Sequence, residues 1–460
     1  MTATVKNLAA RMEALIGAHR VVGAVEELEA YEVDGLVPGA VVLPANAAEV
    51  AEVVRFAAAE KLAVIASGSR SKLEIGMPPS RYDIALDTTG MRGIAHYDAG
   101  DLTLSVDAGM GVRQLEMALA EKQQFLPLAV PCFESATVAG TIASGIDSAL
   151  RQQYGTARDF LIGAEFVDGK GNLCKSGGRV VKNVTGYDLH KLLIGSLGTL
   201  GVITRLNFRT FPVPAMYGGH LASFASGESA IAYRQTIEAS GLPVANLEML
   251  NPEITKIVGA ILKKENGPVP ECLDGQGWCV YVSYEGNESV VKRVARDLER
   301  LATEAGAKTS EAAKIATDTQ VGGVLREAFE WLRWAAPMVG LFRITLPRAS
   351  WGDIAELSRS AEGLPLRGSL LLRAAGAIYF AMMAGSENEA TQAALDGAAS
   401  RVFSFVEARQ GHATLLHAPL ASKARGNVWG QCADMMMMRR VKQAFDPQNI
   451  FAPGRFVGGI

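Results

Sequence analysis

Three glycines, Gly195, Gly198 and Gly201, recur at every third position in the stretch LLIGSLGTLGVIT, and a β-branched run follows them directly. Glycine in a regular element costs about 0.5–1 kcal/mol relative to alanine, so its repeated use indicates a backbone that turns through positive φ or lies against something flat. The period matches collagen, but it ends after three repeats and lacks proline, which excludes a triple helix. A bound ligand would explain these glycines; the packing of a helix onto a strand is the alternative.

The chain of 460 residues is longer than one hydrophobic core usually serves, which predicts two domains. Its 20% of charged residues and net charge of −3 are typical of a soluble globular protein and lack the basic excess of a nucleic-acid-binding protein. The N-terminus has no signal-peptide core and no stretch reaches 18 uninterrupted apolar residues, so we expect a cytoplasmic protein without a transmembrane segment. Five cysteines without a C-x-x-C pair predict scattered reduced thiols.

Patterns of strands and helices divide the chain into three parts. Residues 40–67 predict a βαβ unit, and a strand that closes on prolines near position 214 ends a first domain over 1–214, with its core over about 35–214. Two of the strand-before-helix patterns that follow resemble ferredoxin-like βαβ units and predict an α+β domain over 215–425. No tight internal sequence repeat is visible. The segment 426–460 is expected to return to the first domain.

One motif has the layout of a dinucleotide-binding turn. The segment VDAGMGVRQLEMAL places Gly109 and Gly111 between a strand and a helix. Gln114 stands where close packing of the strand and the helix would require the third glycine, and no acidic residue closes a second strand about 20 residues further on. We therefore interpret this segment as an ordinary turn.

Three other loops fit a flavin nucleotide better. The loop over 65–76 follows a buried strand and offers backbone N–H groups, hydroxyls and charges for a pyrophosphate. The loop over 131–145 is rich in small and β-branched residues, which permit the close approach of a flat ring. In the third loop, 154–173, the charged pair Arg158 and Asp159 stands among small residues at the start of a strand, which indicates a hydrogen-bonding role toward the cofactor.

These segments resemble a known family. ATVAGTIASG, YGTARDFLIGAEFVDGKGNL and GGRVVKNVTGYDLHKLLIGSLGTLGVIT are similar to the FAD domain of the vanillyl-alcohol-oxidase superfamily, and more narrowly to the FAD-binding E subunit of bacterial glycolate oxidase. The C-terminal FDPQNIFAPGRF is similar to that family's closing motif. The resemblance implies an α+β fold class: a two-subdomain FAD-binding domain of the p-cresol-methylhydroxylase (PCMH) type, followed by an α+β, ferredoxin-like second domain.

The resemblance also implies where FAD binds. The expected cofactor-binding residues are Ser67, Gly68, Ser69, Arg70, Ser71, Lys72, Pro131, Thr137, Ala139, Gly140, Thr141, Gly145, Tyr154, Gly155, Arg158, Asp159, Gly198, Gly201, Val202 and Ile203. The pyrophosphate loop has fewer glycines than the family pattern. Neither this loop nor the segment before Gly140 has a histidine for covalent attachment, and Cys132 is offset by one position from a second attachment point, so we expect noncovalent FAD.

The residues of the chemical step are less evident. Oxidation of a 2-hydroxy acid by a flavin requires a hydride acceptor, a base for the hydroxyl proton and a cation for the carboxylate. The H-x-G-D-G-N metal motif of related enzymes is absent, so no metal site is expected. His412 and His417 are the candidate bases, although an offset of five places them on opposite faces of a strand. Arg333, Arg343 and Arg373 could bind the carboxylate or belong to a solvated face.

We therefore expect an enzyme subunit, a FAD-dependent oxidoreductase that oxidises a small 2-hydroxy acid such as glycolate or D-lactate. The resemblance implies an iron–sulfur partner subunit, a sister flavoprotein subunit and contact with the inner membrane through the complex. Docking surfaces are expected around residues 435–438 and 330–340, where methionines and tryptophans gather. The alternative is a noncatalytic subunit in which FAD relays electrons or stabilises the complex.

Overall fold

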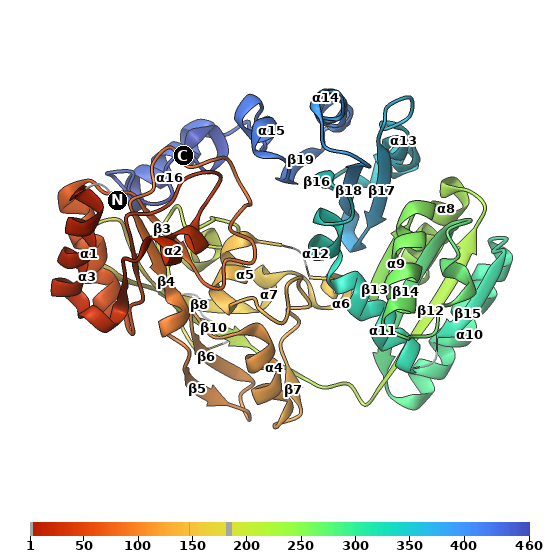
Figure 1. Cartoon of the computed structure of the whole chain (residues 1–460). Helices are drawn as coiled ribbons and strands as arrows, with labels where there is room; N and C mark the ends of the chain where they lie inside the picture. The colour runs from red at the N-terminus through yellow and green to blue at the C-terminus, as the bar shows by residue number, and fades with distance from the viewer. Residues whose placement is uncertain (1–2, 147, 181–185, 314) are drawn as a thin grey trace.

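The computed structural model describes residues 3–146, 148–180, 186–313 and 315–460. Figure 1 shows a first domain on the left and a second, sheet-rich domain on the right, which begins with β12 (Met216–Phe224). The last long helix, α16 (Met435–Phe445), lies back on the first domain, where the ring of Phe445 packs against that of Phe166. The N-terminal helix α1 (Ala3–Ile16) belongs to the same domain.

The first subdomain contains a small sheet in the order β1-β2-β4-β3, in which β2, β4 and β3 run parallel. Its strands are β1 (Val21–Val22), β2 (Ala40–Val42), β3 (Val64–Ser67) and β4 (Ile84–Asp87). Parallel strands need a crossover connection, which α3 (Ala47–Glu60) supplies between β2 and β3, the two strands on either side of β4. Asn46 caps this helix by accepting a hydrogen bond from the Glu49 N–H. This is the βαβ unit predicted from the sequence.

The second subdomain is an antiparallel sheet in the order β5-β6-β10-β8-β9. Its strands are β5 (Ile94–Asp98), β6 (Thr103–Asp107), β8 (Leu161–Val167), β9 (Leu173–Gly177) and β10 (Val202–Arg209). The central strand β10 is the β-branched run that follows the three glycines. A short ribbon of β7 (Gln124–Phe125) and β11 (Phe211–Pro212) accompanies this sheet. The other helices of the first domain are α2 (Val25–Leu28), which packs on the first sheet, and α4 (Val112–Ala120), α5 (Val138–Ser144), α6 (Arg151–Tyr154) and α7 (Ala157–Phe160).

The second domain is built on one antiparallel sheet in the order β15-β12-β14-β13-β17-β18-β16-β19. The order repeats itself, because β12 to β15 and β16 to β19 each have their strands in the ferredoxin-like arrangement 4-1-3-2. The remaining strands are β13 (Val244–Leu250), β14 (Trp278–Gly286), β15 (Thr309–Ala313), β16 (Met338–Thr345), β17 (Arg367–Leu372), β18 (Ala377–Ala384) and β19 (His412–His417). Two ferredoxin-like units thus share one sheet, joined at the pair of β13 and β17.

Helices of both domains pack on this sheet. Those of the second domain are α8 (Gly227–Ser240), α9 (Pro252–Lys264), α10 (Glu288–Glu304), α11 (Ile315–Arg326), α12 (Ala328–Arg333), α13 (Ile354–Arg359) and α14 (Glu389–Glu407). From the first domain, α6 packs against β13. The short α12 packs against β16 and β18, and it lies where the two domains meet (Figure 1).

The C-terminal segment joins the first domain. After α15 (Leu420–Arg425) and α16 (Met435–Phe445), the chain runs beside β3. The Val64 N–H donates to the Ile450 carbonyl at 2.7 Å, and the Ala452 N–H donates to the Val64 carbonyl at 2.9 Å. The tail therefore lies at the edge of the first sheet, close to the loop that follows β3.

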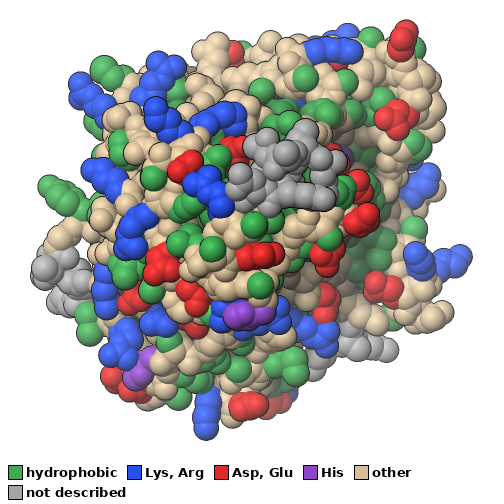
Figure 2. All heavy atoms as spheres, turned by 60° about the vertical axis from the view of Figure 1, so that its left-hand side comes forward, with side chains coloured by type: hydrophobic (Ala, Val, Ile, Leu, Met, Phe, Trp, Pro, Cys, Tyr) green, Lys and Arg blue, Asp and Glu red, His purple; other side chains and the backbone are tan. Residues whose placement is uncertain are grey.

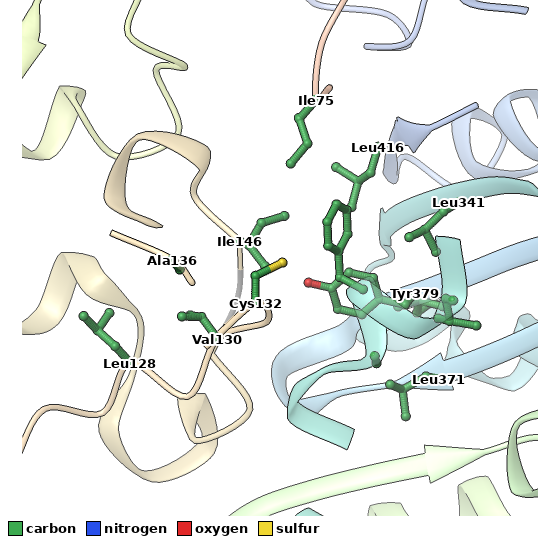
Figure 3. Close-up of a cluster of buried hydrophobic side chains, with 14 of the residues drawn as sticks. Ile75, Leu128, Val130, Cys132, Ala136, Ile146, Leu341, Leu371, Tyr379 and Leu416 are labelled. Atoms are coloured by element: carbon green, nitrogen blue, oxygen red, sulfur yellow. The ribbon is translucent and has the colours of Figure 1, made fainter. Parts of the chain in front are cut away.

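Apolar side chains fill the boundary between the domains. Figure 3 shows Ile75, Cys132 and Ile146 of the first domain opposite Leu341 and Tyr379 of the second, all of them buried. On the outer surface, Figure 2 shows cationic and acidic side chains interspersed over one face. No helix in the described part of the chain is long and apolar enough to cross a membrane.

Candidate functional site

A loop with unpaired backbone groups follows β3. In the described structure, the backbone N–H groups of residues 69–72 donate no hydrogen bond to a protein acceptor. The hydroxyl of Ser67 is buried and also has no partner among the described residues. The loop lies against the start of α5, where a Cβ atom on Gly68 would lie 2.0 Å from the Oγ1 atom of Thr137. We call residues 67–72 the cradle, since unpaired N–H groups of this kind form a binding site for an anion.

The cradle is one wall of a cleft with an empty volume of about 720 Å³. Its opposite wall comes from α5 and from the chain before and within β10. Apolar groups, among them Ala139, Ile203, Leu73 and Ile75, line the cleft. The C-terminal Arg455, which is 2% exposed, donates to the carbonyls of Leu73 and Ile75 and so fixes the loop.

The structure brings together many of the residues expected to bind the cofactor. The cleft is lined by the predicted Ser67, Gly68, Ser69, Arg70, Ser71, Lys72, Thr137, Ala139, Gly140, Gly198, Gly201 and Ile203. Thr141, Gly145 and Arg158 line a second cavity instead, while Pro131, Tyr154, Gly155, Asp159 and Val202 line neither. Residues 181–185 of the GGRVVKNVTGYD segment lie outside the described residues.

Several cleft residues were not anticipated. They are Ala66, Leu73, Ile75, Thr88, Ala143, Ser144, Leu197 and Arg455. Five of them lie within the predicted loops over 65–76 and 131–145, and Leu197 lies in the glycine-rich stretch, but none was singled out. Thr88 and Arg455 lie outside these segments, and the only signal for Arg455 was its position in the closing motif of the tail.

The two cations of the cradle point at protein groups. Arg70 forms an ion pair with Asp87 at 3.1 Å, and its guanidinium lies 4.0 Å from the centre of the Tyr31 ring. The Nζ atom of Lys72 donates to the hydroxyl of Ser71 and to the Pro131 carbonyl, both at 3.2 Å. The anion-binding capacity of the cradle therefore comes chiefly from its backbone.

The three regularly spaced glycines have different tasks. Gly195 and Gly198 both have positive φ, of 74° and 73°. A Cβ atom on Gly201 would lie 2.8 Å from the Val167 carbonyl, and one on Gly145 would lie 2.8 Å from the Cα atom of Gly195. Gly198 and Gly201 line the cleft, whereas Gly195 packs against Gly145. The turn through positive φ and the close backbone packing considered from the sequence both occur.

These residues fit FAD. A pyrophosphate needs several convergent N–H donors, which the cradle leaves unpaired, and a glycine at position 68 keeps the loop close to α5. An adenosine and a flavin ring need apolar walls, which Ala139, Ile203 and Ile75 supply.

A group of charged residues lies where the cradle loop meets the second domain. Arg333, at the end of α12, donates to the Ser71 carbonyl at 3.2 Å and pairs with Glu74 at 2.7 Å and with Glu330. The other carboxylate oxygen of Glu74 lies 3.2 Å from Nδ1 of His417 on β19. We call Glu74, Glu330, Arg333 and His417 the junction cluster.

The charges of the junction cluster support one another. Burial by itself raises the pKa of Glu74, but the hydrogen bonds and charges of His417 and Arg333 outweigh it and lower that pKa to about 2. Next to the cluster, the Cys132 thiol donates to Glu330 at 3.0 Å. Burial, together with the Glu330 carboxylate, raises the pKa of Cys132 to about 12, so the thiol keeps its proton. Cys132 also has a positive φ of 59°, which is rare for a residue with a side chain.

The other candidates for the chemical step have different surroundings. The Nε2 atom of His412 lies 3.3 Å from the hydroxyl of Thr414 on its own strand. Arg373 is buried in the second domain, 3.1 Å from Glu248. Arg343 donates to the Gly145 carbonyl at 2.8 Å. Of the two candidate histidines, His417 is the one that contacts the cradle loop.

Comparisons with known proteins agree with this architecture. Residues 38–177 match the FAD binding domain family, and residues 220–361 and 430–456 match the C-terminal domain of FAD linked oxidases. The solved structure of p-cresol methylhydroxylase with substrate bound has a TM-score of 0.77 at 17% identity, covering 99% of this chain and 97% of that one. The chain is therefore a FAD-dependent oxidoreductase with the vanillyl-alcohol-oxidase fold, which confirms the predicted fold class and cofactor.

Within this class, the chain is homologous to glycolate oxidase subunits at low identity. It is 37% identical to glycolate oxidase subunit GlcE of Escherichia coli K12 over 164 residues, which cover 35% of this chain and 46% of that protein. It is 23% identical to glycolate oxidase subunit GlcD of Bacillus subtilis 168 over 431 residues, which cover 91% of this chain and 88% of that protein. The first alignment spans about half of its relative and the second nearly all.

Proposed function

We propose that this chain oxidises a small 2-hydroxy acid, glycolate or D-lactate, as the subunit of a glycolate oxidase-like complex that corresponds to GlcE. One observation carries the proposal: the short loop over 67–74 contains the cradle and ends in Glu74 of the junction cluster. Through Glu74, the loop that would hold the cofactor therefore contacts a group that contains a base and a cation.

Bound noncovalently, FAD would supply the ring that accepts a hydride. The N–H groups of residues 69–72 would hold its pyrophosphate, and the apolar residues Ala139 and Ile203 would contact the adenosine. The flavin ring would then lie near Leu73 and Ile75, because Ile75 lies at the boundary with the second domain (Figure 3) and Glu74 of the junction cluster stands between the two in the chain.

His417 is the proposed base. Its Nδ1 atom is held by Glu74, which leaves Nε2 to accept the proton of the substrate hydroxyl. Arg333 is the proposed cation for the substrate carboxylate. That carboxylate would take the place of Glu330, which is the more exposed of the two acidic partners of Arg333, 39% against 26%.

Electrons would leave through an iron–sulfur partner, beside a sister flavoprotein subunit. Met436, Met437 and Trp334, which are 70%, 59% and 66% exposed, fit the proposed docking surfaces around 435–438 and 330–340. Co-purification from the native host tests this assembly, and in cell fractions it should be found in the cytoplasm or at the inner membrane. A chain that elutes alone and turns over fast with oxygen would contradict it.

A noncatalytic electron relay is the second candidate. It is favoured by the pairing within the junction cluster, since Arg333 already contacts two carboxylates and has no charge left for a third unless Glu330 moves. In that case a sister subunit would oxidise the substrate.

Anaerobic addition of glycolate or D-lactate to the FAD-loaded chain separates the two. Bleaching of the flavin absorbance by either acid, and none by L-lactate, is expected for the enzyme. No bleaching, together with rapid flavin reduction when a catalytic sister subunit is added, is the outcome expected for the relay. Acid precipitation then tests noncovalent binding, because the yellow colour should stay in the supernatant.

A further inference from the structure

Three lysines in the described part of the chain are almost fully buried, and one of them differs from the others. Lys423 pairs with Asp34 at 2.9 Å, and Lys442 pairs with Asp446 at 2.7 Å. Lys72, 8% exposed, has no carboxylate within 4.0 Å of its Nζ atom among the described residues. A buried ammonium group without a counter-charge is unfavourable, so its presence requires an explanation.

The nearest acidic groups, Glu327 and Glu330, supply that counter-charge only in part, because each is held by other partners. Glu327 accepts hydrogen bonds from the backbone N–H groups of Cys132 and Phe133, at 2.6 and 3.3 Å. Glu330 is bound by Arg333 and by the thiol of Cys132. Burial lowers the pKa of Lys72 from its ordinary value, which agrees with a charge that the protein alone compensates poorly.

The position of Lys72 shows what kind of charge is missing. Its Nζ atom contacts Ser71 and Pro131, and the carbonyl of Ser71 accepts from Arg333 of the junction cluster. Lys72 therefore lies on the side of the cleft that faces the second domain. In the proposed function this side holds the flavin ring, whereas the pyrophosphate is held by backbone N–H groups.

From this placement we infer that Lys72 is the counter-charge of the reduced flavin. A ring that takes up a hydride gains one negative charge, and a buried ammonium group beside it stabilises that state more than the neutral oxidised one. Lys72 is thus a positioning residue whose charge raises the reduction potential of the bound FAD and so makes it a stronger oxidant. The inference rests on the ring placement in the proposed function but not on the identity of the substrate.

The test uses the FAD-loaded full-length chain and reference dyes, with no 2-hydroxy acid present. In Lys72→Met, reduced FAD should bind at least about tenfold more weakly relative to oxidised FAD than in the wild type, which lowers the two-electron potential by about 30 mV. Lys72→Arg keeps the charge and should shift the potential by less than half as much. Lys292→Met, which removes an exposed cation of the second domain that is paired with Glu288 at 2.7 Å, should leave the potential unchanged.

An equal loss of affinity for oxidised and reduced FAD, with an unchanged potential, would overturn the inference, because Lys72 would then pair with the pyrophosphate. A Lys72→Met chain that loads poorly is measured at excess FAD, and Lys72→Gln provides a second neutral variant. A wild-type chain that fails to oxidise any 2-hydroxy acid would contradict the proposed function. The potentials of the variants would still decide the role of Lys72.

Discussion

The cradle and the junction cluster meet at one loop, which carries the cradle and Glu74, yet the polar groups of the two are arranged in opposite ways. In the cradle, the N–H groups of residues 69–72 and the hydroxyl of Ser67 lack protein partners within the described chain. In the junction cluster, Glu74 contacts Arg333 and His417, and Arg333 contacts Glu74 and Glu330. The first arrangement suits a ligand that arrives with its own charges, and the second suits groups that must hold their positions during a reaction.

This difference separates the effects of substitutions. A change in the cradle should alter the affinity for FAD, because its donors gain their partners only from the ligand. A change in the junction cluster should alter the rate or the stability and leave FAD bound, because its groups are held by one another. Each variant is therefore measured for its FAD affinity and for its rate or stability, and a change in the other quantity would contradict this separation of effects.

The largest effect is expected for His417→Gln. Removing the proposed base should lower the turnover of glycolate or D-lactate by about 10²–10⁴-fold. The dissociation constant of FAD should stay within about twofold of the wild type, since the imidazole contacts Glu74 and not the cradle. His412→Gln is the matched control on the same strand and should keep its turnover. Equal losses in both variants would remove His417 from its proposed role.

Gly68→Ala should weaken FAD binding by about 100-fold. The new Cβ would lie 2.0 Å from Oγ1 of Thr137, so the loop must move away from α5 and the cradle loses its shape. Because the clash is with a side chain, Thr137→Ala in the same chain should restore part of the affinity. Gly323→Ala adds a methyl group where nothing lies within 4 Å and should bind FAD normally. Unchanged affinity in Gly68→Ala would show that the cradle does not need this close contact.

Glu74→Gln should lower the free energy of unfolding in a pH-dependent way, an effect smaller than the two above. The carboxyl has a pKa of about 2 in the folded chain against an ordinary 4.5, so it stabilises the fold above about pH 4.5, and this contribution disappears as the pH falls toward 2. The difference in unfolding free energy between wild type and variant should be about 1–3 kcal/mol above pH 4.5 and shrink below it. Urea unfolding from pH 5.5 to 2.5 measures this, with FAD content as the second readout. A constant difference across this range would contradict the ion-paired state of Glu74.

The sequence predicted those parts of the architecture that depend on residues close together in the chain. The cradle could be located because glycine, serine and a preceding buried strand lie within a few residues of one another, and the βαβ unit because its apolar pattern is continuous. The duplicated ferredoxin-like order was not visible. It is a repeat of topology, and the two halves of the sheet share no evident sequence pattern.

The junction cluster could not be predicted, because it is assembled from three distant segments. Glu74 follows the cradle, Arg333 ends α12 and His417 ends β19, so no spacing in the sequence relates them. Arg455 is a similar case, since it donates to the carbonyls of Leu73 and Ile75, which lie more than 370 residues earlier in the sequence. Side-chain partners of this kind depend on the tertiary fold, which one sequence without its fold does not specify.

Arg70→Ala should have the smallest effect on FAD. As a charged residue of the pyrophosphate loop, Arg70 was expected to bind the phosphates, but its guanidinium is paired with Asp87, which also accepts a hydrogen bond from the Tyr31 hydroxyl at 2.7 Å. Its removal should therefore change the dissociation constant of FAD by less than about threefold and leave the salt dependence of binding unaltered. Its removal should instead lower the free energy of unfolding, because Asp87, 2% exposed, loses its counter-charge. A dissociation constant that rises steeply with salt in the wild type but not in Arg70→Ala would place Arg70 on the phosphates and give the cradle a side-chain cation after all.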